Sequence, residues 1–533
     1  MKEIPNECIN AILINFAKDS KNLFSCCLVN RLWCLNAIPI LWSNPLQREV
    51  SKSLIRTYIS TLSPEEKEPL ISFGITLPNL PKPLFDYGVF LKVLDTSSTK
   101  NGIELWLKDE GLNNNCDNDE EMLISVTAYN VIMDSLITMF LRKSENLEEL
   151  LINDQHMIPT VTTFLNAMPG ITKLKTLRVK FWNYRIFTNS NIMELINALT
   201  PQVCPHLKQL DIKSYLPSDV SDALVNIIKS HKKLEKIELD TYITTRSTKS
   251  VVVYNISDRA SEKNVKDFFL FCGHISELKI IMNENENKQI AFITFKRETA
   301  AETALMLTNA IIADSQIIVK PLDDINHIYS KIFPVLNYVG DSLKELTLRY
   351  MDFSKISPDN IGNISKCQNL IRLKCINCKK MTSAHCTSLS KNQLNLKTLE
   401  ITDSSLDQNI IIFLISMWGS TLEVLHLDKL SQETANALLI HCLNLKELVI
   451  YNLLADSLKF MLPFLQQSSL KSLLINAFSK SYLKYFDLGP YLPNTLTFLG
   501  LYTDFNNDDF ETFVKYCGKF VDLKTLNIKR LNI

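Results

Sequence analysis

The chain has 533 residues, of which 46% are hydrophobic, so it is long enough for more than one domain with a sizeable core. Lys+Arg and Asp+Glu both number 57, which excludes a chain-wide field attracting nucleic acid, membranes or acidic ligands. Only 12 glycines occur, no glycine-rich phosphate loop is found, and no apolar run is long enough to cross a bilayer. Together with an odd number of cysteines, 13, this predicts a soluble protein of a reducing compartment, cytoplasmic or nuclear.

Residues 4 to 45 are predicted to form three short helices. Pro5 suits a first helical turn, and apolar residues then recur at three- and four-residue steps. Asp19 offers a cap for a second helix over about residues 21–30, and a third helix runs from Arg31 and stops at Pro39. A small domain of this kind has little core of its own, so its exposed apolar residues indicate a partner surface.

Three motifs in this segment resemble the F-box, in order and spacing: Ile4-Pro5-x-Glu7, Cys27-Leu-Val-Asn-Arg-x-Trp33 and Pro39-x-Leu41-Trp42. The alternative is a plain helical cap on a repeat array. The resemblance implies binding to the Skp-family adaptor of a cullin-type ubiquitin ligase. Pro5, Leu28 and Val29 would face the adaptor, while Trp33 and Trp42 would hold the helices together. The full adaptor-binding set that the resemblance implies is Ile4, Pro5, Leu28, Val29, Trp33, Leu41 and Trp42.

Residues 46–145 are predicted to be an irregular linker with degenerate first repeats. Their prolines rule out one long helix, and Phe90-Leu-Lys-Val-Leu-Asp95 is a degenerate repeat. The acidic stretch from Asn113 to Glu121 lacks the carboxylate order and the glycine of an EF-hand, so we interpret it as a solvated insertion.

A repeat of about 26 residues organises most of the remaining chain. Its unit is typified by Asn395-Leu-Lys-Thr-Leu-Glu-Ile-Thr-Asp403, which resembles a leucine-rich repeat; such units stack into a strand–helix solenoid with a horseshoe shape. The predicted repeats occupy residues 146–248 and 323–533. The opening leucines are Leu147, Leu174, Leu207, Leu234, Leu343, Leu370, Leu396, Leu422, Leu445, Leu470, Leu496 and Leu523.

The strand of each repeat is predicted to point its aliphatic residues inward and its intervening residues toward the concave face, because side chains alternate along a strand. These concave positions are candidates for binding a protein substrate, since binding hot spots favour Tyr and Arg. The alternative is that most of them are simply solvated. The candidates are Arg178, Lys180, Arg349, His426, Tyr451 and Tyr502.

The interval from Leu234 to Leu343 spans 109 residues, far more than one repeat. Within it, strand and helix patterns follow in the order βαββαβ, which resembles the RNA recognition motif and predicts an inserted ferredoxin-like domain over residues 249–322. The strands are expected at Val251–Ile256, Leu278–Met282, Gln289–Phe295 and Gln316–Val319, and the helices at about 262–273 and 299–307.

For this insertion the sequence predicts the fold of the RNA recognition motif but disfavours its RNA-binding function. The family stacks RNA bases on three sheet aromatics, and the resemblance places Val252, Ile290 and Phe292 at those positions, with Tyr254 as a neighbour on the same face. Val252 and Ile290 are not aromatic, so two stacking contacts are lost, which reduces the free energy of RNA binding by roughly 2–6 kcal/mol. Residues 250–321 also carry 8 basic against 9 acidic side chains. A protein-binding or residual domain is therefore favoured over RNA binding, and a gene-prediction fusion is a further alternative.

No arrangement of residues typical of an enzyme active site is recognised in the sequence. Cys375, Cys378 and the nearby His385-Cys386 pair suggest zinc, but Cys204, Cys367 and Cys442 each precede an opening leucine by three residues and are better explained as buried repeat positions. No metal or cofactor is predicted. The sequence favours a non-catalytic substrate receptor of a Skp/cullin/F-box ubiquitin ligase, with an unknown protein substrate; the alternative is an RNA-binding protein acting through the insertion.

Overall fold

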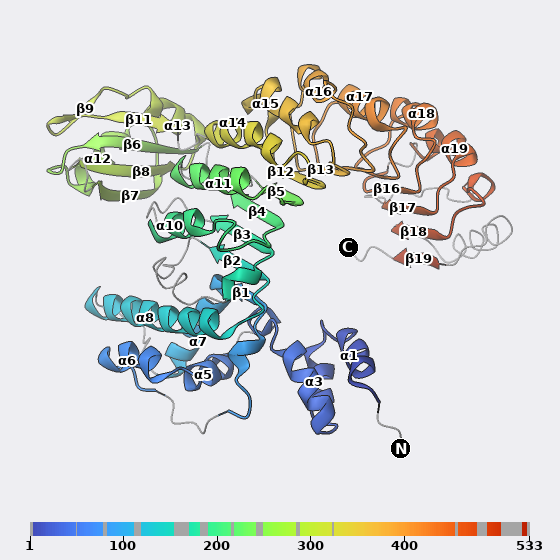
Figure 1. The fold of residues 1–533 in the computed structure, drawn as a ribbon. Coiled ribbons are helices and arrows are strands. Elements are labelled where there is room, and N and C mark those ends of the chain that lie inside the picture. The colour runs from blue at the N-terminus through green and yellow to red at the C-terminus, as the bar shows by residue number, and fades with distance from the viewer. Residues whose placement is uncertain are drawn as a thin grey trace. The chain divides into compact units, whose positions relative to one another are not determined.

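The computed structural model describes residues 4–48, 51–77, 83–110, 119–153, 170–181, 190–214, 218–240, 249–283, 288–321, 325–453, 457–476, 488–502 and 525–529. The chain divides into two compact units, residues 1–240 with 331–533, and residues 241–330 (Figure 1). Both units combine helices and strands, which confirms the predicted mixed α/β class. None of the described helices combines the length and the apolar content needed to cross a lipid bilayer.

The first unit begins with three short helices, α1 (Asn6–Ile14), α2 (Ser20–Cys27) and α3 (Arg31–Leu41). The side chains of Asp19 and Asn30 cap α2 and α3 by accepting hydrogen bonds from backbone amides. A small core forms where the three helices meet. It consists of Ile9, Leu13, Leu23 and Ala37.

The prediction that the third helix stops at Pro39 is wrong, since α3 continues to Leu41. Proline lacks an amide hydrogen and therefore removes one helical hydrogen bond. The last turn of α3 is still hydrogen-bonded, because the Trp42 amide donates to the Ile38 carbonyl oxygen at 2.9 Å.

The described residues between 45 and 143 are largely helical rather than irregular. Pro64 does break the chain, but it does so as the first residue of α6, behind a capping box made by Ser63 and Glu66. Arg142 then binds the buried Glu66 carboxylate through Nε at 2.8 Å and Nη2 at 3.0 Å, which ties α6 to α8. The elements are α4 (Pro45–Arg48), α5 (Lys52–Ser60), α6 (Pro64–Ser72), η1 (Tyr87–Phe90), β1 (Val93–Asp95), α7 (Thr96–Asp109) and α8 (Asp119–Lys143). Of the predicted acidic loop at 113–121, residues 113–118 lie outside the described residues.

A 13-stranded parallel sheet, called the long sheet here, forms the body of the first unit. Its strands follow one another in chain order, except that β5 pairs directly with β12 across the insertion, with Lys236 opposite Glu345. After β1, the strands are β2 (Glu149–Asn153), β3 (Thr176–Phe181), β4 (Gln209–Ser214), β5 (Lys236–Asp240), β12 (Glu345–Arg349), β13 (Arg372–Ile376), β14 (Thr398–Thr402), β15 (Val424–Leu427), β16 (Glu447–Ile450), β17 (Ser472–Asn476), β18 (Phe498–Tyr502) and β19 (Thr525–Lys529).

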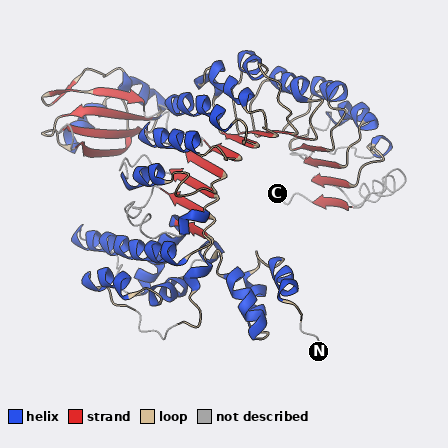
Figure 2. Ribbon diagram, in the orientation of Figure 1, coloured by secondary structure: helices blue, strands red, loops and turns tan. Residues whose placement is uncertain are grey.

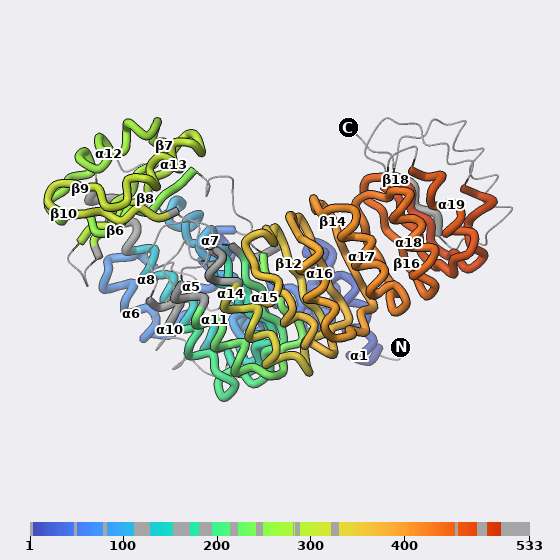
Figure 3. Tube along the Cα trace, turned by 90° about the horizontal axis from the view of Figure 1, so that it is seen from above, coloured from blue at the N-terminus to red at the C-terminus, as the bar shows by residue number. Residues whose placement is uncertain are grey.

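Side-chain alternation separates two faces of the long sheet. In the sequence repeat that opens at Leu396, the first, fourth and sixth residues are buried; these are Leu396, Leu399 and Ile401. The helices lie along one side of the strands (Figures 2 and 3). The third, fifth and seventh residues of each repeat lie on the opposite side of the long sheet, which is called the strand face here. The covering helices are α10 (Ser190–Ala198), α11 (Ser218–Ser230), α14 (Ile325–Val335), α15 (Pro358–Gly362), α16 (Ser383–Leu389), α17 (Gln408–Trp418), α18 (Gln432–His441) and α19 (Leu458–Gln467), with short η2 (Gly170–Lys173), η4 (Leu336–Val339), η5 (Phe353–Lys355), η6 (Asn363–Lys366) and η9 (Gly489–Tyr491).

The cysteines that precede the opening leucines are buried in the first unit. Burial raises the pKa of the Cys204, Cys367 and Cys442 thiols to about 12, so they remain protonated at neutral pH. Cys378 Sγ contacts the Leu348 carbonyl oxygen at 3.4 Å, and His385 Nε2 lies 2.9 Å from the Ile356 carbonyl oxygen. The Cys378 and His385 side chains thus already interact with backbone carbonyl groups.

His231 provides a pH-dependent contribution to stability. Its ring is buried, and Nε2 donates to the Leu199 carbonyl oxygen at 2.8 Å. Burial holds the pKa of this imidazole below its usual value. Below about pH 6.5 the unfolded chain therefore binds a proton that the folded chain excludes, so stability falls as the pH drops through this range.

We expect His231→Gln to reduce this dependence. Urea unfolding at about pH 7.5 and about pH 5.5 should show a smaller loss of unfolding free energy for the variant than for the wild type. Equal losses in the two proteins would contradict the assignment.

The second unit contains a four-stranded antiparallel sheet, called the small sheet here, in the order β11-β6-β8-β7. Ser261 and Asn264 form a capping box that starts α12. The element order βαββαβ confirms the prediction for this segment, with a short β9–β10 hairpin before the last strand. The elements are β6 (Ser250–Ile256), α12 (Glu262–Leu270), β7 (Ile275–Asn283), β8 (Lys288–Phe295), α13 (Glu298–Leu305), β9 (Ile311–Ile312), β10 (Ser315–Gln316) and β11 (Ile318–Pro321).

Candidate nucleic-acid interface

The two faces of the small sheet carry different side chains. Val251, Val253, Ala291 and Ile293 are buried in the hydrophobic core that the sheet shares with α12 and α13. Because side chains alternate, Ser250, Val252 and Tyr254 of β6 and the even-numbered residues of β8 lie on the other face. The hydrogen bond between Ser250 Oγ and Thr294 Oγ1, at 2.9 Å, joins two such residues.

This second face, called the open face of the small sheet, brings together all four residues predicted there. Val252 pairs in register with Phe292. Tyr254 lies two residues beyond Val252 on β6, where a register shift between Val253 and Ile256 accompanies a left-handed φ of 63° at Asn255. Tyr254 and Phe292 are therefore diagonal neighbours, within reach of one another's side chains.

The two aromatic rings differ in exposure. Tyr254 is 37% exposed, whereas Phe292 is 8% and Val252 is 4% exposed. Tyr254 thus offers the more accessible stacking surface, and Phe292 forms the floor beside it.

Two lysines that sequence reasoning missed border these rings. Lys320 on β11 pairs in register with Val252, and its Nζ lies 5.5 Å from the centroid of the Tyr254 ring, a cation–π geometry. Lys279 on β7 pairs with Phe292 from the other side. The two-residue alternation along β7 and β11 was the signal that could have placed both lysines on this face.

Counting charge over the whole domain conceals this local arrangement. Several acidic residues belong to the two helices on the opposite side of the sheet: Glu262, Asp267, Glu298 and Glu302. On the open face, Glu277 at the Thr294 end is the acidic counterpart of Lys279 and Lys320 among the described residues. The open face is therefore more basic than the domain average of 8 basic against 9 acidic residues.

Residues 251–318 match the RNA recognition motif family. The inserted domain is an RNA recognition motif. Two curated relatives align with it: Binding partner of ACD11 1 from Arabidopsis thaliana, 40% identical over 72 residues, and Protein vip1 from Schizosaccharomyces pombe, 39% identical over 67 residues. These alignments cover 14% and 13% of this chain, and 26% and 25% of the respective relatives. The chain thus spans about a quarter of the length of these relatives.

Solved structures align with the same part of the chain. The RRM3 domain of Mip6 is 28% identical, with 14% of this chain and 93% of that domain covered and a TM-score of 0.14. A structure of the three N-terminal RNA-binding domains of the yeast splicing factor Prp24 is 27% identical, with 13% of this chain and 30% of that structure covered and a TM-score of 0.13.

Outside the RNA recognition motif, the predicted adaptor-binding residues fall into two groups. Ile4, Pro5, Leu28 and Val29 are exposed, with Leu28 at 73% and Val29 at 59%. Trp33 and Leu41 pack against the small core of α1–α3.

The expectation that Trp42 holds these helices together needs correction. Its ring stacks on Tyr87 with centroids 3.8 Å apart, and it meets Tyr58 edge-on at 5.5 Å. Trp42 therefore connects α3 to the helices that follow.

The predicted substrate-binding residues all lie on the strand face of the long sheet, but several are already paired within it. Arg178 Nε binds Asp211 at 2.9 Å, and Arg349 Nε binds Glu238 at 2.8 Å. His426 Nε2 lies 3.1 Å from Glu447, and the Tyr451 ring meets the His426 ring edge-on. Lys180 and Tyr502 are half-buried on the same face.

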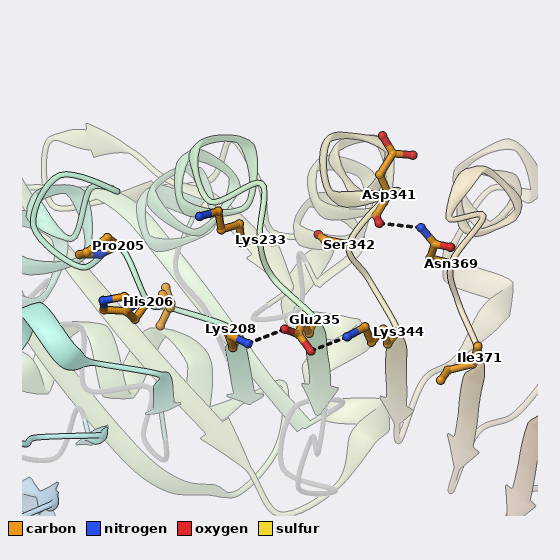
Figure 4. A pocket seen from close by; sticks show the side chains of 11 residues that line it. Pro205, His206, Lys208, Lys233, Glu235, Asp341, Ser342, Lys344, Asn369 and Ile371 are labelled. Carbon is orange, nitrogen blue, oxygen red and sulfur yellow. Dashed lines mark hydrogen bonds and ion pairs between the residues drawn. The ribbon is translucent and has the colours of Figure 1, made fainter.

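Sequence reasoning also missed a cavity of about 710 Å³ at the beginnings of β4, β5, β12 and β13 (Figure 4). Glu235 lies at its centre and accepts hydrogen bonds from Lys208 at 2.7 Å and Lys344 at 2.9 Å. These lysines hold the pKa of the Glu235 carboxyl below its usual range. Glu235 therefore neutralises one of the two lysine charges and joins the repeats on either side of the insertion. The lining residues are Pro205, His206, Leu207, Lys208, Lys233, Glu235, Asp341, Ser342, Lys344, Asn369 and Ile371.

Proposed function

We propose that this protein binds single-stranded RNA through the open face of the small sheet. The observation that carries the proposal is the diagonal pair of Tyr254 and Phe292, bordered by Lys279 and Lys320, within a domain that matches the RNA recognition motif. The comparisons favour this alternative over the ubiquitin-ligase hypothesis, because the matched residues 251–318 are those of the inserted domain.

The chemistry of this face suits an unpaired strand. Each base stacked on an aromatic ring contributes roughly 1–3 kcal/mol, and lysines at the border can contact phosphates. Val252 and Ile290 replace two of the usual rings, so the affinity should be modest and shared between two bases.

Full-length protein and a fluorescein-labelled random single-stranded RNA test the proposal by fluorescence anisotropy. We expect binding that weakens with salt with a slope of roughly −1.4 in log K against log salt, as two phosphate contacts to a single strand predict. Ultraviolet crosslinking followed by peptide mapping should locate the contact on β6 or β8.

A chain lacking residues 250–321, closed by a Gly–Ser linker, is the matched control. The pairing of β5 with β12 should preserve the long sheet in this variant. Equal RNA binding by the shortened and the complete chain would refute the proposal.

A second candidate function rests on a separate observation, the exposure of Leu28 and Val29 beside the F-box-like motifs of α1–α3. We propose that this segment binds a Skp-family adaptor, and that the leucine-rich repeats of the long sheet hold a protein substrate for a cullin-type ubiquitin ligase. In this proposal the chain is not itself an enzyme; partner subunits supply catalysis by positioning. The cytoplasm or nucleus is the compartment that we propose for both functions.

Replacing Leu28 and Val29 with glutamate is expected to abolish co-purification with the adaptor, because two charges would enter an apolar contact surface. Deletion of residues 1–45 should have the same effect. The matched control is Ile440→Glu, which charges an equally exposed residue, 65% accessible, on α18. Adaptor binding that survives the double substitution would eliminate this candidate.

A further inference from the structure

The strand face of the long sheet changes character along its length. From β3 to β14 many of its charged residues form a set of ion pairs, and Glu345 lies within 4 Å of three basic residues, Lys236, Arg372 and Lys374. A charged ligand would have to break these pairs before it could form new ones. Other members of the set are Arg178–Asp211, Lys213–Asp240, Arg349–Glu238 and Lys374–Glu400.

Apolar residues replace these charges on β16, β17 and β18. Val449, Leu474 and Gly500 occupy the fifth position of consecutive repeats and are register neighbours. A Cβ atom at Gly500 would lie 3.2 Å from Phe498 Cε1 and 3.3 Å from Leu474 Cγ, so both side chains close over this glycine. We call Val449, Leu474, Phe498 and Gly500 the apolar strip.

The apolar strip is unusual because the core of these strands uses the opposite set of side chains, such as Leu448, Leu473 and Leu499. Within the strip Val449 and Gly500 are buried, whereas Leu474 and Phe498 are half-buried and offer the accessible apolar surface. At the same position on neighbouring strands the chain carries Lys374, Glu400 and His426, which shows that folding does not demand an apolar residue there. Tyr451 and Tyr502, both half-buried, flank the apolar strip at the seventh position. Tyrosines of this kind are frequent binding hot spots.

One end of the apolar strip is acidic. Burial is the largest cause that raises the pKa of the Tyr451 hydroxyl, and the nearby carboxylates of Glu400, Asp403, Glu447 and Asp428 raise it further. His426 lies between two of them, with Nδ1 3.9 Å from Glu400 and Nε2 3.1 Å from Glu447. Its Nδ1 is buried and lacks a hydrogen-bond partner in the described part of the chain. We call these four carboxylates the acidic border.

We propose that the apolar strip and the acidic border bind an extended segment of another protein, which places an aromatic or aliphatic side chain on the strip and a lysine or arginine against the border. Charge complementarity selects this occupant, because Glu400 pairs with Lys374 and the other three carboxylates beside the strip, Asp403, Asp428 and Glu447, repel a polyanion such as RNA. His426, Val449, Leu474 and Gly500 lie on four adjacent strands, so the surface is about 14 Å wide at the usual strand spacing and accommodates several residues of an extended segment.

This inference deepens the second proposed function, since it names the chemistry of the substrate segment. Its test needs neither the adaptor nor RNA, so failure of the inference and failure of adaptor binding can be told apart.

The test pans a phage library of random short peptides against the full-length protein. We expect enriched peptides to combine aromatic or leucine residues with lysine or arginine. Fluorescein-labelled copies should bind Leu474→Asp about tenfold more weakly than the wild type, a change of about 1.4 kcal/mol. Glu447→Lys should also weaken these peptides, by removing one carboxylate of the border.

Two variants keep the test independent of folding. Leu474→Met conserves volume and should bind like the wild type. Lys236→Ser changes the strand face at β5, away from the apolar strip, and should have no effect.

The inference is overturned if no peptide is enriched, if acidic peptides are enriched, or if Leu474→Asp and Lys236→Ser change binding equally. It is also overturned if Leu474→Asp lowers RNA affinity while leaving peptide binding intact, because the strip would then serve RNA.

Discussion

Full-length protein carrying both Tyr254→Ala and Phe292→Ala is expected to bind single-stranded RNA roughly 2–6 kcal/mol more weakly than the wild type, because each ring stacks one base for about 1–3 kcal/mol. This corresponds to a loss of about 30-fold or more in affinity. Each single substitution should produce a smaller part of the loss. Fluorescence anisotropy with the random RNA measures all three proteins.

Matched variants separate stacking from folding. Tyr254→Phe retains the ring and should bind nearly like the wild type. Phe292 is 8% exposed, so its removal could also loosen the sheet. Phe292→Leu keeps an apolar side chain there but removes the ring, and should weaken RNA binding while the domain stays folded by circular dichroism. Unchanged affinity in the double variant would show that stacking on this face does not hold RNA.

Leu399→Ala is expected to lower the free energy of unfolding of the first unit by about 2–5 kcal/mol, because it leaves a cavity in a closely packed core. Leu399 is fully buried on β14, and it lies in register between Leu373 on β13 and Leu425 on β15. Urea unfolding followed by circular dichroism measures the change.

Lys397→Ala is the control for this prediction, at the start of the same repeat. The Lys397 side chain is 43% exposed and pairs with Glu423 at 2.9 Å, and an ion pair at the surface contributes at most about 1 kcal/mol. Similar losses for Leu399→Ala and Lys397→Ala would be inconsistent with the alternation that assigns leucine to the core.

Most of the inserted domain was predictable from residues close together in the sequence. Val251–Ile256 and Gln289–Phe295 are rich in β-branched and aromatic residues, and their strands begin and end within one residue of the expected positions. The prediction of function was less accurate. Total charge led us to disfavour RNA binding, whereas pairing between strands places Lys279 and Lys320 beside the aromatic residues.

Residues 46–145 were the least predictable segment. Their prolines indicated a break in the helix, but Pro64 begins a helix and Pro69 lies inside one. The contact that stabilises this arrangement joins Glu66 to Arg142. No local pattern reveals a pair separated by 76 residues.

The sequence alone determined where the strands lie, which of their residues are buried, and that a separate domain interrupts the repeats, because alternation and period depend on neighbours along the chain. The tertiary structure decided which charges meet. Only folding brings β5 against β12, sets Lys208 and Lys344 on either side of Glu235, and places Lys320 over Tyr254. These contacts depend on distances between residues far apart in the chain, and the same is true of the apolar strip on β16–β18 and of the acidic border beside it.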